Sequence, residues 1–166
     1  MKMGIRVAGL KNLLHEFRKL DPAIKNEVRI ASKKIAEDEV PRLKAAAARS
    51  DKLSAAVGVT IRARSERVPM VVVGGAKKLS IGSKGAQGRN ALGQFTKRAD
   101  NRPRAGDVFF GAEFGGGMRK STKQFRPHRG TQGYWMWPQL REDEMFMIQD
   151  WLDAIDRALD GQKAGL

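Results

Sequence analysis

Apolar residues recur at helical spacing in two stretches near the start of the chain. The stripe of the first stretch consists of Leu10, Leu13, Leu14, Phe17 and Leu20. Asp21 and Pro22 follow it, and this pair is typical of a helix N-cap and a first helical position. A second helix is therefore expected from Pro22, with an apolar face of Ile24, Val28, Ala31, Ile35 and Leu43. We expect Pro41 to kink this helix or to end it near Val40.

The period of the pattern changes after the second helix. Over residues 53–64, Val57, Val59 and Ile61 alternate with smaller or polar residues, which is the pattern of a half-buried strand. Residues 68–73 are rich in valine and predict a second strand, with Pro69 near its start. We expect the two strands to form an antiparallel hairpin.

Residues 76–133 have no hydrophobic periodicity and are rich in glycine and basic residues. One apolar island, residues 108–115, lies inside this stretch and is expected to form a strand or a single helical turn. A connection this long is uncommon inside a compact domain, and its composition is typical of segments that become ordered on a partner. We therefore expect a single domain whose core comes from residues 1–75 and 107–166, while residues 76–106 form a basic arm or loop.

The end of the chain predicts a closing helix. An aromatic segment, residues 134–138, precedes a third amphipathic pattern. Its apolar face carries Ile148, Trp151, Leu152, Ile155 and Leu159, and its acidic face carries Asp150, Asp153, Asp156 and Asp160. The fold class that follows is α+β: a small antiparallel sheet covered by N-terminal and C-terminal helices, with a long extended basic arm.

The formal net charge of +14 is unevenly distributed along the chain. Residues 76–138 hold 13 Lys/Arg against 3 Asp/Glu, whereas residues 139–166 hold 3 against 7. Such positive charge favours phosphate backbones, anionic membranes or acidic protein surfaces, although it also keeps a glycine-rich segment soluble and extended. The candidate contacts for DNA or an acidic partner are Lys77, Lys78, Lys84, Arg89, Lys97, Arg98, Arg102, Arg104, Arg119 and Lys120.

The sequence offers little for catalysis, and we do not expect an enzyme. The absence of cysteine excludes disulfides, thiolate metal sites and a cysteine nucleophile. Neither His15 nor His128 has a neighbour that suggests a base or a metal ligand, and the acids at 142–144 are expected to stabilise the start of a helix. The glycines match no phosphate-binding or dinucleotide motif. No cofactor and no metal ion are therefore expected.

Membrane association is not expected either. No apolar run approaches the roughly 18 residues that a membrane-spanning helix needs. Residues 1–7 also lack the hydrophobic region of a signal peptide. We expect the protein to be made and kept in the cytoplasm until it assembles.

Three short motifs, in this order, resemble a bacteriophage family. Residues 5–13 (IRVAGLKNL) are similar to its I-x-V-x-G-L-x-x-L start, and residues 111–115 (GAEFG) to its central E-F/L-G element. Residues 125–127 (FRP), followed by aromatic residues and a closing helix, are similar to its P-F-x-x-P end. The family comprises small tail components of long, non-contractile-tailed phages, akin to head–tail joining and tail-completion proteins such as the minor tail protein Z of phage lambda. Its central connection is usually shorter, so the resemblance does not cover residues 77–104.

The resemblance implies a non-enzymatic structural protein of the virion neck, at the head–tail junction after assembly and in the host cytoplasm before it. It would form a homo-oligomeric ring, expected to be sixfold, between the head connector and the tail tube. Its neighbours would be head connector, tail terminator or tail tube proteins, together with packaged DNA. Such a ring is built from heterologous contacts, in which one surface of each subunit binds a different surface of the next, and the ring closes by symmetry.

Large aromatic side chains dominate both cores and interfaces, so they are the candidates for subunit contacts. The candidate residues for subunit or partner contacts are Phe95, Phe109, Phe110, Glu113, Phe114, Trp135 and Trp137. The two tryptophans could instead attach the last helix to the core.

The alternative function is that of a non-specific nucleic-acid-binding accessory protein. Glycine, lysine and arginine with occasional aromatics can follow a phosphate backbone without recognising its sequence. No known DNA- or RNA-binding module is visible. Any such contact would be weakened strongly by salt.

Overall fold

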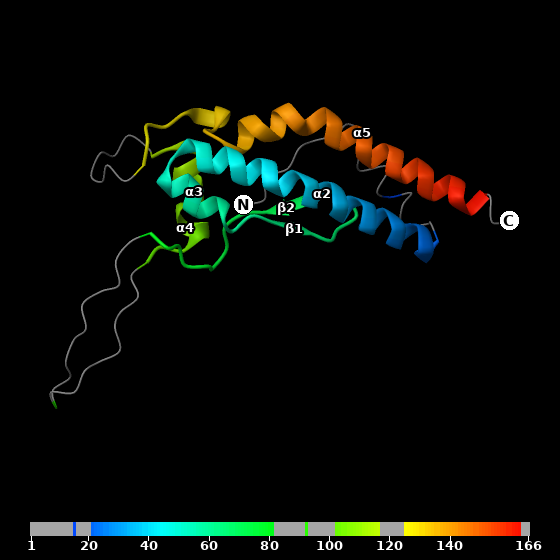
Figure 1. The fold of residues 1–166 in the computed structure, drawn as a ribbon, viewed down its shortest axis with the longest axis horizontal. Coiled ribbons are helices and arrows are strands. Elements are labelled where there is room, and N and C mark those ends of the chain that lie inside the picture. Colours follow the sequence, from blue (N-terminus) through cyan, green and yellow to red (C-terminus); the bar gives the residue numbers. More distant parts are fainter. Residues whose placement is uncertain (1–14, 16–20, 82–91, 93–101, 117–124, 164–166) are drawn as a thin grey trace.

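Two long helices lie side by side and run in opposite directions along the length of the molecule (Figure 1). They are α2 (Pro22–Ser50) and α5 (Met136–Lys163) of the computed structural model. The structure describes residues 15, 21–81, 92, 102–116 and 125–163. The remaining elements are α3 (Lys52–Gly58), β1 (Arg62–Arg64), β2 (Met70–Val72), α4 (Ala105–Phe114) and the 3-10 turn η1 (Gly130–Gln132). The described residues therefore form four α-helices and a small antiparallel sheet, in agreement with the α+β class.

Helix α2 begins where the sequence predicts and ends later. The Asp21 carboxylate accepts a hydrogen bond from the backbone N–H of Ala23 at 2.7 Å, which fixes the first turn. The helix then continues through Pro41 to Ser50, so the expected end near Val40 is wrong. Proline removes one backbone donor from the helix. The turns that follow it bury apolar side chains, with Leu43 and Ala47 fully buried, and this packing outweighs the loss.

The start of α2 packs against the second half of α5 through apolar side chains. Hydrogen bonds from both helices also reach the turn of the β-hairpin. The buried residues of this cluster are Ile24, Val28, Trp151, Ile155 and Ala158. The indole Nε1 of Trp151 donates to Ser32 Oγ at 3.0 Å and to the carbonyl of Arg67 at 3.2 Å. Ser32 Oγ donates to the same carbonyl at 3.0 Å. These bonds attach the turn between β1 and β2 to both long helices.

The strand expected over residues 53–64 is wrong for most of its length. The Asp51 carboxylate caps a new helix by accepting from the backbone N–H of Ser54 at 2.6 Å, and α3 follows. A Cβ at Gly58 would lie 2.6 Å from Ala47 Cβ, so this glycine lets α3 approach α2 closely. The antiparallel hairpin is confirmed but is short, since β1 pairs with β2 only from Arg62–Val72 to Arg64–Met70.

The stretch expected to form the basic arm is described only at its two ends. Leu79 N donates to the carbonyl of Pro103 and Ala105 N to the carbonyl of Lys77, both at 2.9 Å, so the two ends are paired antiparallel. Leu79, at one of these ends, is 2 % exposed and belongs to the main core. Residues 82–91 and 93–101 lie outside the described residues.

The helix expected over residues 10–20 is also outside the described residues, except for His15. That residue is helical and exposed.

Candidate functional site

The apolar island of the sequence forms a buried helix. Residues 108–114 were expected to form a strand or a single helical turn, and they lie in α4 (Ala105–Phe114), which is ten residues long. Its side chains Val108, Phe109, Ala112 and Glu113 are buried. An isolated helix of this length would not be stable in water, so packing against α3 and the start of α5 holds it. Gly115 ends it with φ +80°, a conformation that favours glycine.

Glu113 connects α4 to the start of α5. Its carboxylate is fully buried and accepts hydrogen bonds from three consecutive backbone N–H groups. The distances are 3.3 Å from Trp135 N, 2.9 Å from Met136 N and 2.8 Å from Trp137 N. A helix start leaves such N–H groups without partners, so a distant side chain caps α5 here. Burial raises the pKa of the Glu113 carboxyl above its usual value, and the backbone donors act against that shift.

Gly133 provides the space for this cap. It has φ +70°, and a Cβ there would collide with Glu113 Oε1 and lie 2.8 Å from Trp137 Cβ. Glycine is therefore required at this position by both its backbone conformation and its surroundings.

Arg126 connects the segment after α4 to α2 and α3. Its Nε forms an ion pair with the Asp51 carboxylate at 2.8 Å, and its Nη2 donates to Ser50 Oγ at 2.8 Å. Longer bonds reach Ser54 Oγ at 3.4 Å and the carbonyl of Ala112 at 3.3 Å. Because Asp51 also caps α3, one guanidinium joins the end of α2, the start of α3 and the last turn of α4.

Tyr134 lies on the same guanidinium and completes the junction. Its ring centroid is 3.7 Å from the Arg126 Cζ, and its hydroxyl donates to the carbonyl of Pro127 at 2.7 Å. Residues 116 and 127 form a short parallel bridge, in which Gly116 N donates to the carbonyl of Arg126 at 2.8 Å. Residues 111–116, 125–129 and 133–137, which are separate in sequence, therefore meet at one end of the molecule. We call this arrangement the junction.

The structure distributes the predicted interface residues between the core and the surface. Phe109, Glu113 and Trp135 are at most 7 % exposed, Phe114 and Trp137 are half-buried, and Phe110 is 40 % exposed. Phe110 stacks on Phe114 with ring centroids 6.3 Å apart. Phe95 lies outside the described residues. Phe110 is thus the most accessible of the described candidates.

The predicted basic contacts are described only in part. Lys77 and Arg104 are exposed, and Lys78 and Arg102 are half-buried. The others, Lys84, Arg89, Lys97, Arg98, Arg119 and Lys120, lie outside the described residues. The structure therefore brings together only the roots of the basic segment, where residues 78 and 104 are bridged.

A second buried carboxyl cluster lies between α2 and α5. Asp143 accepts from Arg42 Nη1 at 2.8 Å and from Gln139 Nε2 at 2.6 Å. Glu39 is 2 % exposed beside them, and its Oε1 has no hydrogen-bond partner among the described residues. Burial, with a smaller contribution from the Asp143 charge, raises the pKa of Glu39 to about 7, while Arg42 acts in the opposite direction. The acidic run 142–144 was expected at a helix start, and Asp143 lies in the second turn of α5. Its ion pair with Arg42 joins α5 to α2.

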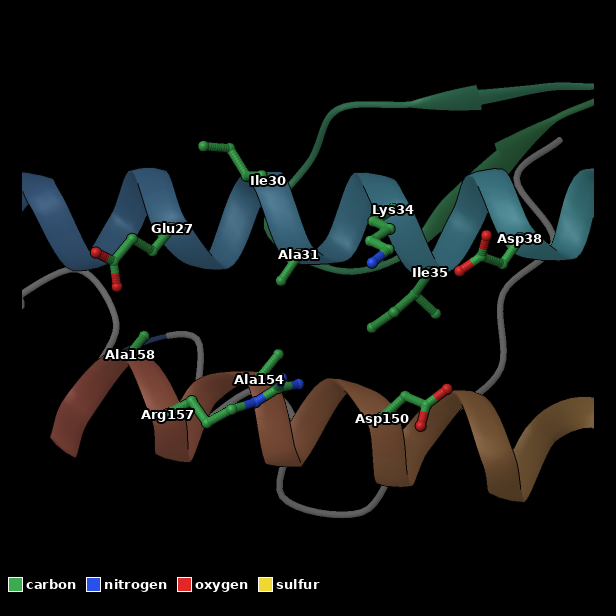
Figure 2. A pocket seen from close by; sticks show the side chains of 10 residues that line it. All are labelled: Glu27, Ile30, Ala31, Lys34, Ile35, Asp38, Asp150, Ala154, Arg157 and Ala158. Atoms are coloured by element: carbon green, nitrogen blue, oxygen red, sulfur yellow. The ribbon is translucent and has the colours of Figure 1, made fainter. Parts of the chain in front are cut away.

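A groove lies between the two long helices. Figure 2 shows Ala31 and Ile35 of α2 and Ala154 and Ala158 of α5 pointing towards one another across it. Its charged lining mixes acids and bases: Glu27, Lys34, Asp38, Asp150 and Arg157. This lining contains no histidine or hydroxyl nucleophile. The groove therefore offers neither a general base with a nucleophile nor a set of metal ligands.

Over the part of the chain that the structure describes, no group of three or more His, Asp or Glu side chains is placed to hold a metal ion. None of the described helices is long and apolar enough to cross a membrane. Comparison with protein-family models, curated proteins and solved structures found no match to this chain. The hydrogen bonds and the ion pair of the junction join α2, α3, α4 and the start of α5.

Two residues of the junction were not identified from the sequence. Arg126 was noted only as part of a motif, and the capping role of Glu113 was not expected. Glu113 did carry a signal, since an acid within an apolar stretch is buried only when it is paired or hydrogen-bonded. Arg126 carried no comparable signal, because its partners come from positions about 75 residues earlier.

Proposed function

We propose that this chain is a structural protein of the neck of a tailed bacteriophage, a head–tail connector or tail-completion protein. It forms a ring between the head connector and the tail tube. The observation that carries the proposal is the junction. Two of the three motifs that resemble the phage family, GAEFG and FRP, are separated by residues 116–124, and they meet there with the aromatic segment.

The chemistry of the junction supports a structural role. Glu113 caps α5, Arg126 joins three helices, and Tyr134 covers the guanidinium. Each of these groups is engaged in holding the subunit together, and none is free to act on a substrate. A ring component needs a subunit of fixed shape, because the same contact is repeated at every interface around the ring.

The surface of the junction supports a role for this end in subunit contacts. Phe110 is 40 % exposed on α4, and Val59, which follows α3, is 65 % exposed. Aromatic side chains that are partly exposed on a rigid helix are frequent at interfaces. We place a subunit contact at Phe110.

Residues 77–104 form the extended basic arm of the proposed ring. The arm reaches a neighbouring subunit or faces the DNA channel. Its charge supports both roles, since it contains eight Lys/Arg and one acid. The hydrogen bonds from Leu79 and Ala105 pair the two ends of this stretch, so both ends of the proposed arm start from one place on the subunit.

Immunogold labelling of virions that carry this protein tests the proposal. A single cluster of label at the head–tail junction is expected. Label along the tail, or no label on intact particles, would contradict a neck location. The deletion of residues 82–101 with a short glycine linker spares the buried Leu79 and should prevent DNA-filled infectious particles from forming.

The alternative, a non-specific nucleic-acid-binding accessory protein, is favoured by the charge of residues 76–138. It requires the isolated chain to bind duplex DNA with micromolar affinity and a steep dependence on salt. Virions without label, together with such binding, would favour this alternative.

A further inference from the structure

The outer face of α5 combines exposed apolar side chains with acids. Eight residues lie on it at helical spacing, and all eight are exposed: Glu142, Met145, Phe146, Gln149, Leu152, Asp153, Asp156 and Asp160. Met145 is 73 %, Phe146 69 % and Leu152 40 % exposed. We call these eight residues the outer face.

The composition of the outer face selects a particular kind of partner. Four of the eight residues are acidic, three are apolar and none is basic. Arg157 lies beside the face, and its Nε donates to the backbone carbonyl of Asp153. A partner that fits must be positively charged and must carry apolar side chains separated by flexible backbone.

The basic segment of this same chain has that chemistry. Between its paired roots, residues 80–102 carry Lys84, Arg89, Lys97, Arg98 and Arg102 with the apolar residues Ile81, Leu92 and Phe95. Glycines at 82, 85, 88 and 93 separate them. The one acid of this segment is Asp100. We propose that the outer face of one subunit binds residues 80–102 of a second copy of this chain, an inference that rests on the proposed ring.

The dimensions of the two surfaces agree. Because the two ends of the segment are paired, its 23 residues could reach outward by at most about half their extended length, or about 36 Å. The outer face extends over 19 residues of helix, from Glu142 to Asp160, a rise of about 27 Å. The segment is therefore long enough to cross the face.

The positions of the two surfaces favour a second copy over the same chain. In Figure 1, α5 and the roots of the segment next to α4 lie on opposite sides of α2. A donor on one side of a subunit and an acceptor on the other form a head-to-tail contact, which closes into a ring when the rotation allows it. Charge complementarity then fixes the direction in which the subunits join.

Cysteine cross-linking of the full chain tests the inference, because the natural chain contains no cysteine. The double variant Phe146→Cys with Leu92→Cys carries one thiol on the outer face and one on the segment, both at exposed positions. Mild oxidation should give a ladder of covalent oligomers on a non-reducing gel, and reduction should collapse it. The matched control is Ile30→Cys with Leu92→Cys, since Ile30 is 61 % exposed on α2 and not on the outer face. The control pair should remain monomeric under the same conditions.

Three outcomes would overturn the inference. They are a ladder of equal yield from the control pair, a cross-link within single chains, and no cross-link from the Phe146 and Leu92 pair. Charge reversal gives a second measurement: Asp153→Lys with Asp156→Lys should lower the yield of the ladder about fivefold at low salt. An unchanged yield would contradict a role for charge.

Failure of this inference can be distinguished from failure of the proposed function. Label at the head–tail junction without the ladder would leave the neck role standing and remove the outer face as the acceptor. A ladder without label at the junction would keep the contact between copies and remove the neck role.

Discussion

The buried carboxyl of Glu39 should make the stability of this protein depend on pH in an unusual direction. The side chain is 2 % exposed between α2 and α5, and its pKa is about 7 in the folded chain compared with 4.5 ordinarily. Between these two values the folded state holds a proton that the unfolded state has released. The contribution of Glu39 to the free energy of unfolding therefore decreases as the pH rises from about 4.5 to 7.

The magnitude follows from the size of the shift. Each pKa unit corresponds to about 1.4 kcal/mol, so the loss on ionisation of Glu39 is at most about 3 kcal/mol. Arg42 moderates it, because its positive charge favours the ionised carboxylate of Glu39. The substitution Glu39→Gln keeps the shape of the protonated acid and cannot ionise. At pH 8 the variant should be more stable than the natural protein by about 1–3 kcal/mol, and at pH 4.5 the two should differ little.

Urea unfolding followed by the fluorescence of the buried Trp135 and Trp151 measures this difference at each pH from 4.5 to 8. The matched control is Glu37→Gln on the exposed side of α2, where Glu37 pairs with Lys33 at 3.2 Å. This control should change the free energy of unfolding by less than about 0.5 kcal/mol at every pH. Parallel pH profiles of the natural protein and Glu39→Gln would refute the reasoning.

Three further substitutions test the junction by the same urea assay. Glu113→Ala should lower the free energy of unfolding by about 2–4 kcal/mol, because three N–H groups at the start of α5 lose their acceptor, and Glu113→Gln should cost less. Gly133→Ala should cost at least about 2 kcal/mol from the collision with Glu113, whereas Gly130→Ala, at φ +61° with open space around it, should cost only about 1 kcal/mol. Arg126→Lys should cost about 1–2 kcal/mol, since an ammonium cannot contact Asp51 and Ser50 while covering the Tyr134 ring. Equal costs for the two glycine variants, or no cost for Arg126→Lys, would contradict the geometry of the junction.

The long helices could be predicted because their signals are local. Asp21 and Pro22 mark the start of α2, and apolar residues at helical spacing mark the faces of α2 and α5 that pack together. Pro41 misled the prediction of where α2 ends, because the apolar packing that follows it could not be weighed from the sequence.

The region of α3 shows where periodicity is ambiguous. Val57, Val59 and Ile61 alternate as in a strand, but Val57 and Ile61 also lie one helical turn apart. Val57 and Ile61 are buried and Val59 is 65 % exposed, which is the helical spacing. Asp51, three residues before Ser54, was the available sign of a helix start.

The junction could not be predicted, because its bonds join positions far apart in the chain. Arg126 contacts residues 50, 51 and 54, and Glu113 contacts residues 135–137. An apolar island of ten residues becomes a helix only when such partners surround it. Spacing along the sequence carries no information about these contacts.

The geometry of the junction also explains what the E-F-G motif can indicate. Glu113 is needed as the cap of α5, and Gly115 is needed because its φ is +80° and the carbonyls of Arg126 and Pro127 lie where a Cβ would be. Both requirements arise from the fold of the subunit, so the motif is informative about shape and not about chemistry. The properties that distinguish this chain must then lie on its surface. The described surface that stands out is the outer face of α5, where acids surround Met145 and Phe146. Cross-linking at that face is therefore more informative about function than substitution of the motif residues, whose loss would unfold the subunit whatever it does.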